Sequence, residues 1–389
     1  MTLSRLSALL LLMLALAGCG GRAVLGLDAS GVVKANAAIP APVLNDKTGP
    51  KAVVPVFVAT SRERSDNLSL PYSAKRSPKL NFSRIDIGIP PTHKNGEVEK
   101  STTKPNPARN FAATTFQPYD SGQIFVEKIN AELAKRPANQ RELFIFVHGY
   151  NNNFADSVFR AAQMSYDFGI PAVTLHYSWP SAGSLGLYVY DRDSATFGRD
   201  GLAETLRLAA KTKASKILLV GHSMGSFVVM EALKDLAENG HSDVFRRMSG
   251  VMLAAPDIDI DVFQAQVADI GQLPRPFTVL VSRADRALNV SGRIVGGHPR
   301  VGDGSSIPVL QKLGIVVLDA SDLDGGAHGV FASSPTLMNM ARSGQLSERV
   351  LAGDERSAGQ AVLADGTSVI TGAASLVIYL PGRLLGVVQ

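Results

Sequence analysis

The residues best suited to chemistry lie in one pentapeptide, Gly221-His222-Ser223-Met224-Gly225. A serine hydroxyl acts as a nucleophile when a sharp strand-to-helix turn presents it and a base removes its proton, and glycines beside it leave room for that turn. The apolar run 216–220 precedes the pentapeptide, and the helix-patterned segment 226–236 follows it. Because this is the context that such a turn requires, the pattern predicts that Ser223 is a nucleophile.

The base for such a serine is expected to be a histidine that follows it in the chain. His328 lies in a glycine-containing segment just after the last predicted strand, and glycines allow a loop to return the imidazole toward the serine. We therefore predict that His328 is the base. Two other histidines follow the serine, but His241 lies in a polar connection and His298 lies between two predicted strands.

A carboxylate must orient the imidazole of the base. Asp285 follows the apolar run 277–281, at the strand end where the acid of this arrangement usually falls, so we predict that it is the acid. Asp257 lies one strand earlier and is the alternative, for which we expect a structural role.

Reaction at a carbonyl group also needs donors for the oxygen that becomes negative. The backbone N–H of Met224, the residue after the serine, is the first expected donor of this oxyanion hole. The second is expected from Gly149 or Tyr150, which follow the apolar run 143–147. We expect His148 to hold this loop in place rather than to transfer protons.

These residues must be positioned by strands and helices that alternate along the chain. Runs rich in Val, Ile and Leu alternate with segments of helical spacing, which predicts a mostly parallel sheet with helices on both faces. The fold class is therefore α/β, with the order of elements of an α/β-hydrolase fold. Residues 53–60 and 82–89 are expected to form a hairpin at the sheet edge, and 106–120 to be irregular. The other predicted strands are 143–147, 172–177, 217–220, 251–254, 277–281 and 315–318, and the predicted helices are 123–135, 155–168, 194–211, 226–237 and 262–270.

Composition limits the classes of function. The chain has 389 residues, of which 45% are hydrophobic, and this is enough to bury a large core in one main domain. The formal charge of +5 is spread over 39 basic and 34 acidic residues without a basic block, so we expect no nucleic-acid partner. The sequence has neither a cysteine cluster nor an HExxH pattern, so we expect no metal and no cofactor.

The N-terminus has the features of a secretion signal. Residues 1–18 combine a positive charge with a short apolar run, and Cys19, the single cysteine of the chain, follows directly. Small residues before a lone cysteine resemble the lipobox of bacterial lipoproteins, in which cleavage before the cysteine accompanies its lipidation. We therefore expect lipidation at Cys19 and membrane attachment in the bacterial cell envelope, at the outer membrane, with the domain facing the periplasm or the exterior.

The remaining chain is expected to have three parts. Residues 19–52, rich in Ala, Gly, Pro and Asn, are interpreted as a flexible tether, and 53–345 as the α/β-hydrolase domain. Residues 346–389 form an apolar, glycine-rich C-terminal extension. Its run 369–380 is shorter than the roughly 20 residues that cross a bilayer. We expect a helix there that packs on the domain, with a helix on the membrane surface as the alternative.

Six short motifs are spread along the chain from about residue 53 to residue 343. They are Val58-Ala-Thr-Ser-Arg62, Phe146-Val-His-Gly-Tyr-Asn-Asn152, Ser178-Trp-Pro-Ser181, Tyr190-Asp-Arg-Asp-Ser194, Gly221-His-Ser-Met-Gly225 and Ala255-Pro-Asp-Ile-Asp259. Together they resemble a bacterial family of α/β hydrolases, domain of unknown function 900. The resemblance implies a serine hydrolase of esterase or lipase character that acts on a small-molecule ester or a lipid, with Ser223, Asp285 and His328 as its catalytic residues. The alternative is an inactive hydrolase fold that serves as a binding or scaffold module in the envelope.

Overall fold

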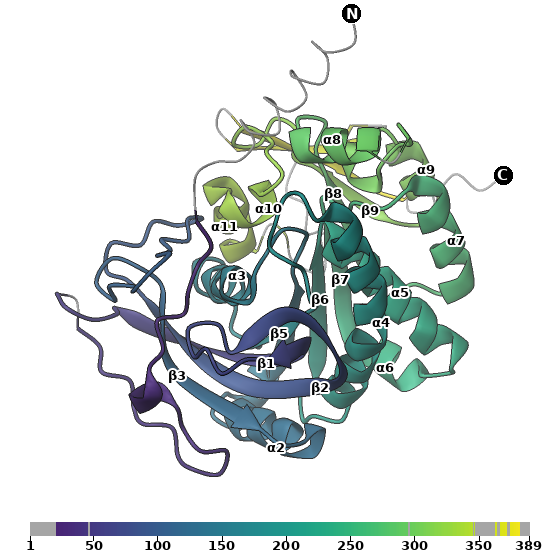
Figure 1. Ribbon diagram of the computed structural model, residues 1–389. Coiled ribbons are helices and arrows are strands. Elements are labelled where there is room, and N and C mark those ends of the chain that lie inside the picture. Colours follow the sequence, from purple (N-terminus) through teal and green to yellow (C-terminus); the bar gives the residue numbers. More distant parts are fainter. Residues whose placement is uncertain are drawn as a thin grey trace, which may run out of the picture.

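The computed structural model of the protein describes residues 21–45, 47–294, 296–344 and 346, and also 362–363, 366–371 and 374–381. The described strands form one sheet of twelve, in the order β10-β11-β12-β9-β8-β7-β6-β4-β5-β1-β2-β3 (Figure 1). The strands are β1 (Ala52–Arg64), β2 (Tyr72–Ile89), β3 (Ala112–Tyr119), β4 (Glu142–Val147), β5 (Val173–Ser178), β6 (Lys216–His222), β7 (Met248–Ala254), β8 (Phe277–Val281), β9 (Val316–Asp319), β10 (Val362–Leu363), β11 (Gly366–Thr371) and β12 (Ala374–Tyr379).

The middle of the sheet is parallel. Strands β1, β5, β4, β6, β7, β8 and β9 pair in that spatial order with the same direction, so their carboxyl ends meet at one edge. Polar residues that follow these strands are therefore brought together, as is usual for the ligand sites of open α/β sheets. The residues after β4, β6, β8 and β9 include Gly149, Ser223, Asp285 and His328.

Helices cover both faces of the sheet. One core holds side chains from α2, α4, α5 and α7, and the other holds side chains from α3, α10 and α11. The helices are α2 (Gly122–Leu133), α3 (Phe154–Asp167), α4 (Tyr188–Ala210), α5 (Met224–Glu238), α6 (Ser242–Arg247), α7 (Ile260–Ile270), α8 (Arg286–Ile294), α9 (Ile307–Lys312), α10 (Val330–Ser333) and α11 (Pro335–Arg342), with short 3-10 turns at Ala29–Gly31, Ala138–Gln140 and Val301–Asp303.

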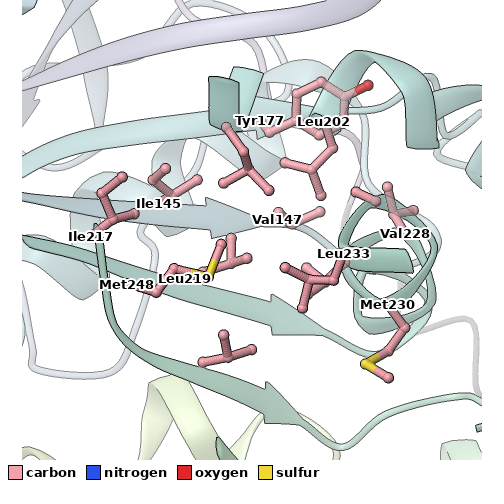
Figure 2. Packing of buried hydrophobic residues seen from close by; sticks show 14 of the residues in the cluster. Ile145, Val147, Tyr177, Leu202, Ile217, Leu219, Val228, Met230, Leu233 and Met248 are labelled. Carbon is pink, nitrogen blue, oxygen red and sulfur yellow. The ribbon is translucent and has the colours of Figure 1, made fainter. Parts of the chain in front are cut away.

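The two cores follow from the alternation of side chains along each strand. In β4, Ile145 and Val147 enter the core beneath α5, whereas Phe144 and Phe146 enter the opposite core. Figure 2 shows Val147 beside the helix that carries Val228, with Ile145 farther back along the same strand. A strand that is buried on both faces has to be apolar throughout, and this explains why β4 reads as the continuous run Leu-Phe-Ile-Phe-Val. This topology confirms the predicted α/β fold class.

The expected hairpin exists, but it is not the edge of the sheet. Strands β1 and β2 are antiparallel, and the other side of β1 pairs with β5. The edge is β3, which lies inside the segment 106–120 that was expected to be irregular, so that expectation is wrong. The sequence of β3 contains Pro118 and little apolar alternation, and proline is tolerated on an edge strand because no neighbour needs its missing N–H.

The expectation of a flexible tether is wrong for its first described part. Ala23 and Leu25 are fully buried in the core of α3, and Leu27 is nearly so. Backbone hydrogen bonds fix this segment, because Leu25 N–H donates to Ser69 and its carbonyl accepts from Ala113. The physical reason is a two-residue apolar period, Ala23-Leu25-Leu27, which lets an extended chain bury one side. Residues 1–20, which include the expected signal segment and Cys19, lie outside the described residues.

The C-terminal extension also differs from expectation. In place of a helix, β12 pairs antiparallel with β9, and it buries Leu376 and Ile378. Alternating β-branched and apolar residues favour a strand that covers one side of a sheet edge. None of the described helices combines the length and the apolar character that crossing a bilayer would need.

Candidate active site

Ser223 stands at the turn between β6 and α5. Its backbone has φ 54° and ψ −123°, which is an unusual conformation for a residue with a side chain and costs about 1–3 kcal/mol. The turn is held from both sides, since Ser223 N–H donates to Ala254 at 2.9 Å and its carbonyl accepts from Asp257 at 3.3 Å. The neighbouring strand β7 thus fixes the predicted nucleophile, which is 4% exposed.

Glycines flank the serine because other chain segments pass close by. A Cβ atom on Gly221 would lie 2.9 Å from a methyl carbon of Val229, and one on Gly225 would collide with the carbonyl groups of Val147 and His148. A Cβ atom on Gly149 would lie 2.9 Å from the Cβ of Ser223. The turn at residues 221–225, called the elbow from here on, and the residues after β4 therefore pack with their backbones in direct contact.

Asp285 and His328 lie together. His328 Nδ1 is 2.6 Å from Asp285 Oδ2, and the Asp285 side chain is fully buried. The other carboxylate oxygen of Asp285 accepts the N–H groups of Ala287 and Leu288 in the first turn of α8, at 2.9 and 3.1 Å. Helix α8 therefore fixes the carboxylate, and the carboxylate fixes the imidazole in turn. The Nε2 atom of His328 makes no hydrogen bond with the described residues, and the ring is 27% exposed.

His222, which precedes Ser223 in the elbow, contacts the loop that carries His328. Its ring lies 4.7 Å from the ring of His328 and stacks on Phe331 at 4.2 Å. Its Nε2 is 3.2 Å from the carbonyl oxygen of His328. Burial, together with the neighbouring His328, lowers the pKa of His222 well below its usual value, so the ring is neutral and Nε2–H donates to that carbonyl. The residue beside the serine thus contacts the predicted base directly.

The alternative residues lie in other surroundings. Asp257 is buried, faces Arg300 at 3.3 Å, and accepts hydrogen bonds from Tyr188 and Ser291. His298 is exposed and lies 3.9 Å from Asp259. His241 lies 3.5 Å from Arg207 on the surface. Within the described part of the chain, none of the three forms a hydrogen bond or an ion pair with Asp285 or His328.

Residues 148–153, named the oxyanion loop after their predicted role, include Gly149 and Tyr150, from which a backbone donor was expected. The N–H groups of Gly149 and Tyr150, and that of Met224 at the start of α5, donate to no other described residue. The carbonyl of Gly149 lies 2.8 Å from His148 Nδ1 and accepts from the Asn152 side chain at 3.1 Å. In a trans peptide the N–H points opposite to the carbonyl, so these contacts also fix the direction of the Tyr150 N–H.

His148 and Trp179 form the support under this loop. Their rings stack at 4.9 Å, and Trp179 Nε1 donates to the carbonyl of His148 at 2.7 Å. Burial lowers the pKa of His148 well below its usual value, which keeps the ring neutral. Both side chains are nearly inaccessible, so their role is to brace the loop.

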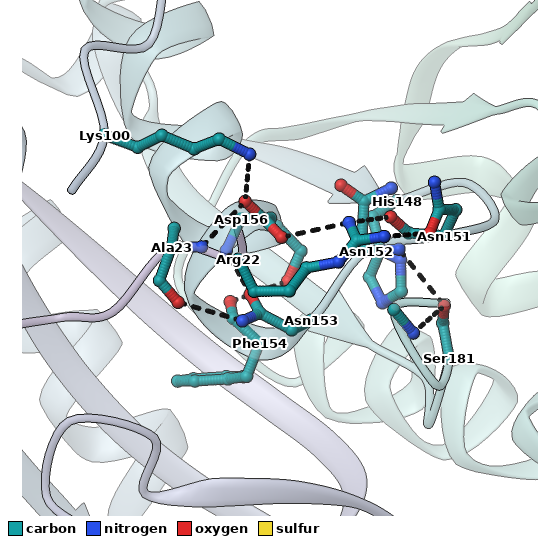
Figure 3. Close-up of polar contacts among 12 residues, drawn as sticks. Arg22, Ala23, Lys100, His148, Asn151, Asn152, Asn153, Phe154, Asp156 and Ser181 are labelled. Carbon is teal, nitrogen blue, oxygen red and sulfur yellow. Dashed lines mark hydrogen bonds and ion pairs between the residues drawn. The ribbon is translucent and has the colours of Figure 1, made fainter. Parts of the chain in front are cut away.

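Two arginines that the sequence reasoning did not single out tie the loop to the rest of the molecule. Arg62 is buried and donates to Asn152, Ser178 and Ser181, which joins three of the motifs described above. Arg22 donates to the carbonyl of Asn151 at 2.7 Å and also to its side chain (Figure 3). The sequence offered one signal for Arg62, because it is the last residue of the motif Val58-Ala-Thr-Ser-Arg62. No motif or spacing around Arg22 indicates its contact with the loop.

The contact of Arg22 belongs to a wider cluster on the first turn of α3. Asp156 accepts from the backbone of Ala23 at 3.3 Å and pairs with Lys100 at 3.0 Å, and Arg22 reaches it at 3.4 Å. Asn153, which caps α3, also donates to the carbonyl of Ala23 at 2.9 Å (Figure 3). The N-terminal segment is therefore bonded to the second half of the oxyanion loop and to the first turn of α3.

Comparison with family profiles identifies the fold. The profile of one family, described as an α/β hydrolase of unknown function (DUF900), matches residues 123–346. No curated protein matches the chain. Among solved structures, Aspergillus fumigatus lipase B is similar over 55% of this chain and 57% of its own length, with 13% identity and a TM-score of 0.37. Esterase B from Lactobacillus rhamnosis, inhibited by a tributyrin phosphonate, is similar over 80% of this chain and 90% of its own, with 11% identity and a TM-score of 0.38.

Proposed function

Because this chain belongs to the family of α/β hydrolases of unknown function DUF900, we propose that it is a serine hydrolase that cleaves carboxylic esters. The observation that carries the proposal is the 2.6 Å contact between His328 and Asp285, beside the strained turn that holds Ser223. A buried carboxylate on one nitrogen of an imidazole and an unpartnered second nitrogen are the arrangement that a serine nucleophile requires.

In the proposed mechanism, Ser223 Oγ attacks the carbonyl carbon of the ester while its proton passes to His328 Nε2. The negative oxygen of the tetrahedral intermediate accepts hydrogen bonds from the N–H of Met224 and from that of Gly149 or Tyr150. The intermediate then collapses, the bond to the alcohol oxygen breaks, and His328 returns the proton to that oxygen. Water, deprotonated by His328, releases the acid from the acyl-serine in the second half of the reaction.

Asp285 has a positioning and electrostatic role in this scheme. It holds the tautomer of His328 in which Nδ1 carries the proton, and it stabilises the imidazolium that forms during both steps. Its second oxygen already accepts two N–H groups of α8, so the carboxylate cannot rotate away from the imidazole.

The test is labelling of the full-length protein with a fluorophosphonate probe, followed by hydrolysis of p-nitrophenyl esters of graded chain length. We expect labelling to disappear in Ser223→Ala and His328→Ala, and Asp285→Asn to lower kcat by about 10⁴-fold because it stabilises the wrong tautomer. His298→Ala is the matched control, since it removes an exposed histidine outside the site, and it should label like the wild type. If the well-folded wild type is not labelled, the result would favour the alternative, an inactive hydrolase fold that serves as a binding or scaffold module.

We also propose, from the sequence, that the protein is attached to the cell envelope through a lipid on Cys19. The test is metabolic labelling of cells with an alkyne analogue of palmitate, which should label the wild type and not Cys19→Ser. Equal labelling of both chains would contradict attachment at this residue.

A further inference from the structure

Exposed apolar side chains gather on the segment between β5 and α4. Leu185, Leu187 and Val189 lie within five residues of one another, and Leu187 and Val189 are 47% and 73% exposed. Single apolar residues on a surface are normal, but a group of them next to a candidate site calls for a partner.

This segment is bonded to the oxyanion loop. The hydroxyl of Tyr150 donates to the carbonyl groups of Ser184, at 3.2 Å, and Leu185. Burial raises the pKa of Tyr150 to about 12, so the phenol remains a donor at physiological pH. The ring of Tyr150 also packs edge-on against that of Tyr188 at 5.3 Å. The apolar side chains are therefore fixed beside the residues that would hold the oxyanion.

Helix α8 continues the same surface. The Tyr188 hydroxyl is 3.1 Å from Ser291 Oγ, which brings the last turn of α8 next to the apolar segment. Ile294 in that turn is exposed, and so are Arg286 and Arg293. The helix contains no acidic residue, and neither arginine pairs with a carboxylate in the described part of the chain. Figure 1 places α8 beyond the end of β8. The surface therefore combines apolar side chains with free positive charge.

The first described residues contact the same loop. Arg22 is bonded to Asn151, the residue after Tyr150, and Cys19 precedes Arg22 by only three residues. Three residues of extended chain span at most about 11 Å. If Cys19 carries the proposed lipid, the oxyanion loop is held close to the membrane surface, because residues 22–27 are packed on the domain and leave no free length there.

We propose that this docking surface, formed by Leu185, Leu187, Val189, Ile294, Arg286 and Arg293, rests on an anionic phospholipid bilayer and that the substrates are acyl esters of lipids in that bilayer. The proposal rests on the ester hydrolase function proposed above and names its substrate class. Apolar side chains of this kind enter the boundary between headgroups and acyl chains, and arginines bind the phosphates. A lipid ester then has only a short path from the bilayer to Ser223.

The experiment compares two substrates with the full-length chain: a soluble p-nitrophenyl butyrate, and a fluorogenic acyl ester in vesicles of phosphatidylglycerol and phosphatidylcholine. Leu187→Ser/Val189→Ser should hydrolyse the soluble ester within twofold of wild type and the vesicle ester at least tenfold more slowly. Val43→Ser/Leu44→Ser is the matched control, because it removes one valine and one leucine that are also exposed, by 83% and 54%. These two residues follow the segment 37–42, which packs beside β2, β3 and α2. This variant should match wild type on both substrates.

Charge is tested separately. Arg286→Gln/Arg293→Gln should slow hydrolysis in vesicles that contain phosphatidylglycerol by roughly 25-fold, from about fivefold for each arginine near an anionic surface, and should leave pure phosphatidylcholine vesicles unaffected. Equal rates of the apolar variant and wild type on vesicles overturn the proposal, and so does an equal loss on both substrates, which would indicate damage to the site itself.

A failure of the proposed function is distinguishable from a failure of the docking proposal. If wild type hydrolyses neither ester, the proposed hydrolase function is contradicted. Membrane docking is then measured separately, by flotation of the Cys19→Ser protein with phosphatidylglycerol vesicles. Adding Leu187→Ser/Val189→Ser should lower the floated fraction at least tenfold relative to adding Val43→Ser/Leu44→Ser. Equal flotation of the two overturns the docking proposal whatever the enzyme activity.

Discussion

Replacing Gly149 by alanine should disable the site while the protein stays folded. The new Cβ atom would lie 2.9 Å from Ser223 Cβ, 2.9 Å from His222 Nδ1 and 3.0 Å from the His222 carbonyl. Ordinary van der Waals contact begins at 3.4 Å, so the loop and the elbow must separate by about 0.5 Å. Neither side yields easily, because Ser223 is bonded to Ala254 and the Gly149 carbonyl is bonded to Asn152.

The magnitude follows from the geometry of the proposed oxyanion hole. Donors act at about 2.7–3.1 Å from the oxyanion, and losing one such donor costs about 2.7–4 kcal/mol. A separation of half an ångström moves a donor out of this range, so we expect kcat to fall about 100-fold, with KM changed much less. The overpacked backbone should also lower the free energy of unfolding by about 1–3 kcal/mol.

The assay is steady-state hydrolysis of a soluble p-nitrophenyl ester together with the rate of fluorophosphonate labelling. Gly186→Ala is the matched control, because a Cβ atom there meets nothing within 4 Å, and its kcat should equal that of wild type. Thermal unfolding of both variants shows whether the fold is kept. A folded Gly149→Ala protein with wild-type kcat would refute the inference that this glycine adjoins the reacting centre.

The remaining predictions concern the contacts that support the site and the fold. Arg22→Ala should lower kcat roughly tenfold, about 1.4 kcal/mol, because the oxyanion loop loses its bond to this side chain. Arg109→Ala, which removes an exposed arginine, is the control and should keep the wild-type kcat. Equal kcat values for the two variants would show that the Arg22 contact does not affect catalysis. His93 lies 2.8 Å from both Glu99 and Asp167, and although burial opposes its charge, these carboxylates raise its pKa above 6.5. The stability that His93 contributes through its charge is thus fully present below about pH 6.5 and is lost as pH rises through the raised pKa. The free energy of unfolding in urea should be higher for wild type than for His93→Gln, with the largest difference near pH 6 and a progressively smaller one toward pH 9. A difference that stays constant with pH would contradict this.

The predictable part of the site is the part that local pattern determines. The elbow at Ser223 carries its strand, its glycines and its helix within about twenty residues, and the structure has all three. Asp285 and His328 were predicted from their positions after strands, and parallel strands bring such positions to one edge. Their mutual contact is found by the structure, and their catalytic roles stay predictions.

The parts that escaped prediction depend on contacts between distant residues. The bond between Arg22 and Asn151 joins positions 129 apart, and no spacing rule connects them. The segment around Leu25 looked like a linker because its apolar period covers only three side chains. The run that forms β12 was too short to separate strand from helix by periodicity alone, and only the open edge of β9 decides between them.

The place of β1 in the sheet has a consequence for the order of folding. One neighbour, β2, follows directly in the chain, but the other, β5, is reached by contacts such as that of Thr60 with Ser178, 118 residues away. Closing so long a loop costs conformational entropy before any contact repays it, so non-local pairing is slow. The meander of β1, β2 and β3 is local and can form early, whereas the parallel sheet has to wait until most of the chain is available. A polypeptide that crosses a membrane from its N-terminus would therefore complete this sheet, and with it the candidate site, only when its translocation is nearly complete.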